Sequence, residues 1–127
     1  MIIGIGTDVI EIDRISQKLN RKGFREKIFS QNEILYCNKK GNNSFQSYAG
    51  IFVAKEAFLK AVGKGLELTY DLYQIEILHD QIGKPQIKLN GNLTNLYKDV
   101  EIFVSISHNK NIALATVVIE GKNDSKN

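Results

Sequence analysis

Apolar residues recur at helical spacing through the middle of the chain and at alternating positions towards its ends. The spacing predicts a helix from roughly Ser44 to Val62 with apolar side chains on every side of the helical wheel, which indicates a buried helix or one shared between subunits. Glu56 nevertheless projects among aromatic and aliphatic neighbours, and a carboxylate removed from water needs a cation or hydrogen-bond donors. Lys60, one turn away, and a metal ion are the candidates. The plainer interpretation is an ordinary solvent-exposed Glu–Lys pair.

The N-terminal segment, Ile2 to Asp8, alternates as a strand with Gly4, Gly6 and Asp8 on one face. Glycine weakens a strand interior unless something approaches the backbone closely. Two glycines beside a carboxylate therefore predict an open floor next to Asp8, with room for a ligand or an ion. In the alternative interpretation Asp8 caps the helix that follows.

That helix is expected from about Asp13 to a stop at Gly23, with Ile12, Ile15 and Leu19 as its buried stripe. Its other face carries cations spaced by three or four residues, namely Arg14, Lys18, Arg21 and, past the glycine, Arg25. Such a row is either a solvated face or a docking surface for an acidic helix or a phosphate backbone. Because the net charge is only +3 and acidic residues interrupt the row, nucleic acid is the less attractive partner.

Turn and cap signals divide the middle of the chain. Ser30 to Glu33 fits a capping box that opens a short helix through Cys37, and Ser44 can cap the long helix. The long helix ends at Gly63-Lys64-Gly65. This loop could close over an anion, although glycine after a helix is first of all a C-cap.

The second half of the chain is rich in strand patterns. Gln74 to His79 is expected to pair antiparallel with Gln86 to Leu89, and a weak helical pattern follows from Asn90 to Tyr97. Ile102 to His108 and Ile112 to Ile119 form a predicted hairpin, with Ser107 and His108 on opposite faces. The chain therefore reads as α+β, an antiparallel sheet packed with a long central helix. One domain is expected over 1–120, followed by a polar tail over 121–127.

Composition narrows the setting. With 127 residues and a single cysteine, the chain has no internal disulfide framework, and Cys37 is expected to pack in a helix rather than act as a nucleophile. No apolar run approaches the ~20 residues of a membrane span, and the N-terminus lacks the charged region of a signal peptide. A cytoplasmic location without membrane contact is the expectation.

Three motifs in this order resemble the holo-[acyl-carrier-protein] synthase family, the small bacterial phosphopantetheinyl transferases. They are Gly4-Ile5-Gly6-Thr7-Asp8, Ala54-Lys55-Glu56-Ala57-Phe58-Leu59-Lys60-Ala61 and Ser105-Ile106-Ser107-His108, and the likeness runs from Met1 to about Ile119. The resemblance implies Mg²⁺-dependent transfer of the 4′-phosphopantetheine arm of coenzyme A to a serine of apo acyl carrier protein, for fatty acid synthesis. Adenosine 3′,5′-bisphosphate would be released.

The resemblance also implies residue roles. Asp8 and Glu56 would bind the metal, Lys60 would lie beside the phosphates, and Glu56 would act as the base, directly or through a water on the metal. The implied coenzyme-binding residues are Lys60, Gly63, Lys64, Gly65, Pro85, Ser107 and His108. The implied docking residues for the acidic carrier helix are Arg14, Lys18, Arg21 and Arg25. The family's small members form homotrimers with active sites between subunits.

Two positions depart from the family. Relatives often have arginine where this chain has Ile51, and usually threonine where it has Lys64, so a basic group would have moved from the helix to the loop.

Two other functions stay open. A non-enzymatic basic adaptor would bind RNA or an acidic protein helix, but it leaves Asp8 and Glu56 without a purpose. An enzyme of the same chemistry could instead serve a polyketide or peptide synthetase carrier.

Overall fold

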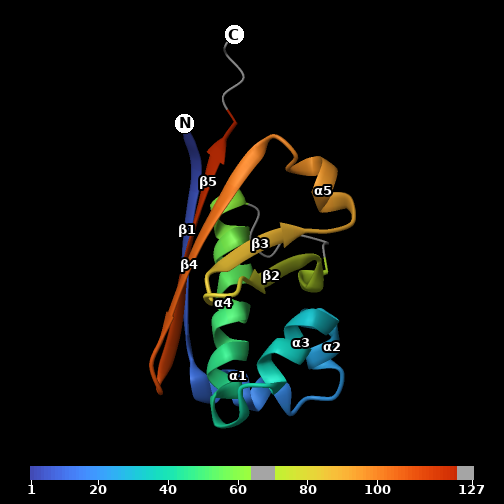
Figure 1. The fold of residues 1–127 in the computed structure, drawn as a ribbon, viewed down its shortest axis with the longest axis vertical. Coiled ribbons are helices and arrows are strands. Elements are labelled where there is room, and N and C mark those ends of the chain that lie inside the picture. The colour runs from blue at the N-terminus through green and yellow to red at the C-terminus, as the bar shows by residue number, and fades with distance from the viewer. Residues whose placement is uncertain (64–70, 123–127) are drawn as a thin grey trace.

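The computed structural model describes residues 1–63 and 71–122, and the predicted α+β class is confirmed (Figure 1). The elements in chain order are β1 (Ile2–Glu11), α1 (Ile12–Leu19), α2 (Phe24–Ile28), α3 (Gln31–Asn38), α4 (Ser44–Val62), β2 (Ile75–His79), β3 (Pro85–Leu89), α5 (Asn92–Leu96), β4 (Val100–His108) and β5 (Ile112–Gly121). Within these ranges no helix has the length and apolar character needed to cross a membrane.

The strands form two antiparallel sheets. The larger has the order β1-β5-β4, with Asp8 opposite Ala115 and Ala115 opposite Ile106, so β1 and β4 are its outer strands. The smaller is the hairpin of β2 and β3. Both predicted hairpins are present, but they belong to different sheets. The β2–β3 hairpin forms the smaller sheet, and the β4–β5 hairpin is joined by β1, which pairs with β5.

Helix α4 runs along the centre of the molecule, between the three-stranded sheet on one side and α3 with the β2–β3 hairpin on the other (Figure 1). Val53, Ala57 and Phe58 are fully buried, and so are Ala113 and Val117 on the facing strand β5. Contact on both sides explains why the helix is apolar all round. The prediction of a buried central helix is confirmed.

The outer face of the three-stranded sheet, the one turned away from α4, is exposed and carries large apolar side chains among polar ones such as Thr7 and Ser107. Alternation along β1 places Ile3, Ile5 and Val9 there with about 60% of each side chain exposed. Phe103 of β4 and Leu114 of β5 add 50% and 40% exposed surface to the same face. We call these five residues the outer sheet patch.

The predicted basic row is divided. The buried stripe of Ile12, Ile15 and Leu19 is confirmed, but α1 ends at Leu19. Gly23, with φ +83°, begins α2 instead of ending α1. Arg14 and Lys18 therefore lie on α1, Arg21 in the turn and Arg25 on α2. The predicted helix end at Gly23 was wrong, because α1 ends at Leu19 and the left-handed glycine begins a second helix that the pattern had not predicted.

The helix ends match the sequence signals in most places. The predicted capping box is present, with the Ser30 hydroxyl accepting from the Glu33 amide at 3.2 Å and the Glu33 carboxylate accepting from the Ser30 amide at 2.8 Å. Gly63 is the left-handed C-cap of α4, with φ +79°. Ser44 does not cap α4, because the helix begins at Ser44 directly after a 3-10 turn, η1 (Gly41–Asn43).

The cysteine is part of the core, as expected. Cys37 is fully buried on α3, and burial raises the pKa of its thiol to about 12. The thiolate is therefore scarce near neutral pH, and the packing interpretation of Cys37 is confirmed.

Candidate active site

The glycines of β1 serve the approach of α4. A Cβ atom built on Gly4 would lie 2.1 Å from the Ala61 carbonyl oxygen, and one built on Gly6 would lie 2.0 Å from that of Ala57. The helix backbone therefore rests directly on the strand, and the predicted open floor beside Asp8 was wrong. Close contact nevertheless produces the predicted neighbourhood, because Glu56 and Lys60 directly precede Ala57 and Ala61 and so lie on the turns of α4 that touch β1.

Asp8, Glu56 and Lys60 meet at this contact, as the motifs predicted; we call them the acidic cluster. Lys60 Nζ donates to Asp8 Oδ1 at 3.0 Å, and the Lys60 side chain stays 55% exposed. Burial raises the pKa of Glu56 above its ordinary value of 4.5, and the charge of Asp8 raises it further, against the opposing effect of Lys60. Asp8 lies in mid-strand and Glu11 is the N-cap of α1, so the capping alternative for Asp8 was wrong.

The chemistry of the acidic cluster suits a hard divalent cation. Two carboxylates that repel each other leave oxygen donors that such a cation would satisfy, and Mg²⁺ in proteins often takes only one or two carboxylates, with substrate phosphates and waters completing the shell. Among the described residues, no group of three or more histidine, cysteine, aspartate or glutamate side chains gathers as a metal site. The donors present therefore fit Mg²⁺ shared with a phosphate ligand better than a metal enclosed by protein.

The basic residues differ in how freely they face solvent. Arg14 and Arg21 are exposed, and Lys18 lies close enough to Glu56 to lower the pKa of that carboxyl. Arg25 is half-buried, with its guanidinium 5.3 Å from the Tyr48 ring centroid. The half-buried Lys18 of α1 therefore borders the acidic cluster, whereas Arg25 is held partly by packing.

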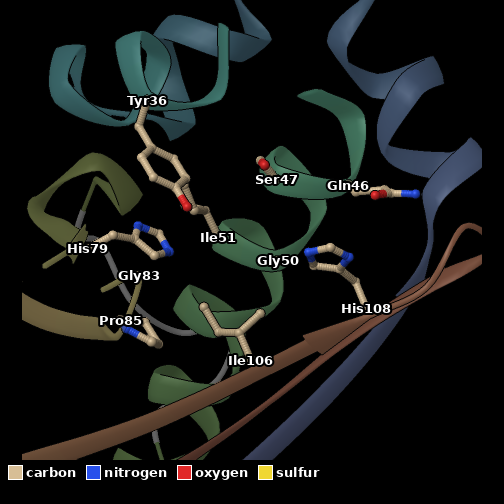
Figure 2. A pocket seen from close by; sticks show the side chains of 10 residues that line it. All are labelled: Tyr36, Gln46, Ser47, Gly50, Ile51, His79, Gly83, Pro85, Ile106 and His108. Carbon is tan, nitrogen blue, oxygen red and sulfur yellow. The ribbon is translucent and has the colours of Figure 1, made fainter. Parts of the chain in front are cut away.

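A cavity of about 130 Å³ lies on the other flank of α4, between α3, α4, the β2–β3 hairpin and β4 (Figure 2). We call it the α3–β4 pocket. The Tyr36 and His79 rings stack at its wall, with centroids 4.0 Å apart and planes 2° from parallel. Lys40 Nζ lies 4.7 Å from the Tyr36 centroid, and because two rings at 4.0 Å leave no room between them, it covers the opposite face of that ring.

The structure brings some of the expected coenzyme residues to this pocket. Pro85 and His108 line it, as does Ile51, the departure from the family pattern (Figure 2). Ser107 is exposed on the outer face of the sheet, opposite in direction to His108. Gly63 lies at the end of α4, and Lys64 and Gly65 fall outside the described residues.

The buried ion pair of Lys55 and Glu33 was not predicted from the sequence. Lys55 Nζ lies 2.9 Å from both carboxylate oxygens of Glu33, and neither side chain is exposed to solvent. Burial raises the pKa of Glu33 and lowers that of Lys55, and their attraction and hydrogen bonds oppose both shifts. The one available signal was a lysine on a helix apolar on every side, since such a lysine requires a buried partner.

Comparison with known proteins agrees with the fold and with the clustered motifs. Residues 4–117 match the 4′-phosphopantetheinyl transferase superfamily. A holo-[acyl-carrier-protein] synthase of Fusobacterium nucleatum is 44% identical over 123 residues, covering 94% of this chain and 99% of that protein. The corresponding protein of Clostridium tetani is 43% identical over 126 residues, covering 96% and 98%. A crystal structure of the holo-(acyl-carrier-protein) synthase from Bacillus anthracis, in complex with CoA (3′,5′-ADP), has a TM-score of 0.82 and 37% identity, covering 96% and 99%.

The chain therefore belongs to the holo-[acyl-carrier-protein] synthase family of the 4′-phosphopantetheinyl transferase superfamily, and it is a phosphopantetheinyl transferase. The expected family and enzyme class are confirmed.

Proposed function

We propose that this enzyme transfers the 4′-phosphopantetheine arm of coenzyme A to a serine of an apo acyl carrier protein and releases adenosine 3′,5′-bisphosphate. The observation that carries the proposal is the acidic cluster: two carboxylates and a lysine from β1 and α4, next to Lys18 of α1. The names of the relatives support the same substrates, since they are holo-[acyl-carrier-protein] synthases and one was crystallised with CoA.

The first part of the proposal concerns the metal. Asp8 and Glu56 would hold Mg²⁺, which when bound supplies positive charge to the pyrophosphate of the coenzyme. The raised pKa of Glu56 reflects burial and the repulsion by Asp8, and a cation between the two groups would relieve the repulsion.

The second part concerns proton and phosphoryl transfer. The carrier serine oxygen forms a bond to the phosphorus of the pantetheine phosphate, while the bond from that phosphorus to the bridging oxygen of the pyrophosphate breaks. Glu56 accepts the serine proton, directly or through a water, and the burial that raises the pKa of Glu56 makes its carboxylate a better base. Lys60, more than half exposed, can leave Asp8 and neutralise the negative charge on the departing bisphosphate.

The third part places the coenzyme across two subunits. In one chain the acidic cluster lies on the β1 side of α4, and the α3–β4 pocket lies on the β4 side. Strand β5 lies between β1 and β4. A coenzyme whose pyrophosphate meets the cluster of one subunit would reach the pocket of a neighbour with its adenosine end. His108, Pro85 and the Tyr36–His79 stack would line that end (Figure 2).

The assembly would be a homotrimer with active sites between subunits. Support comes from the outer sheet patch, an exposed apolar surface of the kind that oligomers cover, and from the separation of the two halves of the site. Trimeric order follows the family resemblance. Ser107, on the outer face, would lie at the subunit contact near the coenzyme.

The carrier protein would dock through the cations of α1 and its neighbours. Arg14, Lys18 and Arg21 would attract an acidic helix, while Arg25 contributes from its place over Tyr48. Because Lys18 also influences Glu56, a carrier bound there presents its serine beside the acidic cluster. The proposed setting is cytoplasmic fatty acid synthesis.

Intact-mass spectrometry tests the reaction. An apo acyl carrier protein is incubated with the enzyme, coenzyme A and Mg²⁺, and a parallel sample contains EDTA. The expected result is a gain of one phosphopantetheine mass that requires both coenzyme and metal. No gain with carriers from fatty acid, polyketide and peptide synthesis would contradict the proposal, while a gain only with the latter two would change the carrier class.

A further inference from the structure

The buried pair of Glu33 and Lys55 connects three elements that are distant in sequence. Besides the ion pair, Lys55 Nζ donates to the carbonyl oxygens of Leu72, at 2.9 Å, and Ile75. Glu33 accepts the backbone amide of Ile77 at 2.7 Å. Helix α3, helix α4 and strand β2 are therefore joined at one point, which we call the Glu33–Lys55 junction.

The same three elements form one part of the wall of the α3–β4 pocket. Tyr36 is one turn beyond Glu33 on α3, and Ile51 is one turn before Lys55 on α4, so each pair shares a helix face. His79 follows Ile77 by two residues, and the two side chains lie on the same face of β2. Each helix thus contributes one side chain to the junction and β2 contributes two backbone groups, and each element places a pocket residue one repeat away on the same face.

Such a register makes the junction a support for the pocket. A helix rotation or a strand slip that separated Glu33 from the Ile77 amide would also separate Tyr36 from His79, because all four groups belong to α3 and β2. The Tyr36 and His79 rings are parallel within 2° with centroids 4.0 Å apart, so a small relative movement of α3 and β2 would break the stacking. Hydrogen bonds have directional limits that apolar packing lacks, so the junction restricts these movements more narrowly than a hydrophobic contact would.

We propose that Glu33 and Lys55 are positioning residues that hold the Tyr36–His79 wall in the geometry that binds the adenosine end of coenzyme A. The inference rests on the proposed function of the pocket. It assigns the pair a role in coenzyme affinity, distinct from the acidic cluster, which lies on the other side of α4. The reaction chemistry at Glu56, the residue next to Lys55, stays with the acidic cluster.

The kinetic test uses a neutral pair. Glu33→Met/Lys55→Met keeps similar side-chain volumes, removes both buried charges and deletes the hydrogen bonds to Leu72, Ile75 and Ile77, and replacement of a buried pair by apolar residues is often tolerated. The expected result is a folded variant with KM for coenzyme A raised by roughly tenfold, the lower end of what loss of supporting contacts costs metal sites. The kcat at saturating coenzyme and the KM for the carrier stay near wild type. Ile119→Ala, a buried change towards the far end of β5, is the control for lost stability alone and should leave KM unchanged.

A spectroscopic readout examines the wall without any ligand. The chain has only two histidines, His79 and His108, so their ring protons are easily resolved by NMR. Stacking on Tyr36 predicts upfield-shifted His79 resonances, assigned with Tyr36→Leu. The neutral pair should lose this shift and the Ile119→Ala variant should keep it. A folded neutral pair with both the shift and the KM of wild type would overturn the proposal.

A measurement on the wild-type enzyme covers the case in which the neutral pair does not fold. If the junction supports the pocket, coenzyme binding must in turn stabilise the junction, because the coupling is reciprocal. Hydrogen exchange at the Ile77 amide should therefore slow more on adding coenzyme A than exchange at Val117 in β5. Equal slowing at both amides would overturn the proposal. If the wild-type enzyme does not bind coenzyme A, the proposed function of the pocket fails. The His79 shift of a folded neutral pair then still decides whether Glu33 and Lys55 position the Tyr36–His79 wall.

Discussion

Gly6→Ala is the sharpest test of how the active site is built. The added Cβ would lie 2.0 Å from the Ala57 carbonyl oxygen and 2.6 Å from the Ala61 amide nitrogen, both backbone atoms of α4. Real Cβ contacts stay above 3.0 Å, so β1 and α4 must move apart by about 1 Å. Backbone atoms cannot rotate away as a side-chain end can, and the whole contact has to open.

The displacement reaches the acidic cluster directly. Asp8 is two residues from Gly6 on the same face of β1, and Lys60 Cβ is itself 3.0 Å from the added atom. The Asp8–Lys60 distance of 3.0 Å cannot survive an opening of that size unchanged. A misplacement of about 1 Å in catalytic groups costs roughly 10²-fold in rate, and overpacking of this kind costs about 1–3 kcal/mol of stability.

The assay measures kcat for carrier modification well below the unfolding temperature, together with urea unfolding. Gly121→Ala is the matched control, because its Cβ would meet Ile3 Cγ2 at an ordinary 3.8 Å, and it should change stability by less than about 0.5 kcal/mol. A Gly6→Ala enzyme with wild-type kcat and stability would refute the claim that close backbone contact sets the cluster.

Four other predictions concern the site and its surroundings. Asp8→Asn or Glu56→Gln should lower transfer by roughly 10²–10⁴-fold in a mass assay, and full activity in either would remove the metal and base assignments. Because folding raises the pKa of Glu56, its ionised form costs stability above that pKa, and the cost disappears as pH falls below the unfolded value near 4.5. Urea titrations should therefore show Glu56→Gln more stable than wild type at pH 7 and equal to it in acid. Arg14→Glu should raise the KM for the carrier in a salt-dependent way and leave the KM for coenzyme A unchanged, whereas an unchanged carrier KM would mean that the cation is merely solvated. Ile5→Lys, in the outer sheet patch, should shift the mass measured by light scattering to that of a monomer and lower activity at nanomolar enzyme; an unchanged mass would place the subunit contact elsewhere.

Sequence patterns predicted most local structure here because local structure depends on neighbours along the chain. The stripe of Ile12, Ile15 and Leu19, the Ser30–Glu33 capping box and the glycine C-cap of α4 all follow from spacings of three or four residues. The errors arose where a signal had two structural meanings. Gly23 could end one helix or begin the next, and the sequence patterns did not contain the tertiary contacts that favour the second outcome.

In the active site, too, the local patterns were predicted and the tertiary contacts were not. Glycines on β1 indicated a close approach, and Glu56 on an apolar helix indicated a partner, but the patterns did not say that the approaching group was the helix carrying Glu56. Lys55 was equally visible in sequence. Its partner Glu33 was assigned to a capping box, and the structure shows that one carboxylate both caps α3 and binds Lys55.

The sequence by itself determined most of the helices and strands, the burial of α4, the three motifs and through them the enzyme family, because each depends on short-range spacing or on the order of residues. Tertiary structure decided that β1 pairs with β5 and that backbone contact sets Asp8 beside Lys60. It also decided that the acidic cluster and the α3–β4 pocket lie on opposite sides of α4. These depend on packing between segments up to about a hundred residues apart, where the free energy comes from shape and burial summed over many contacts and no local pattern records the partner.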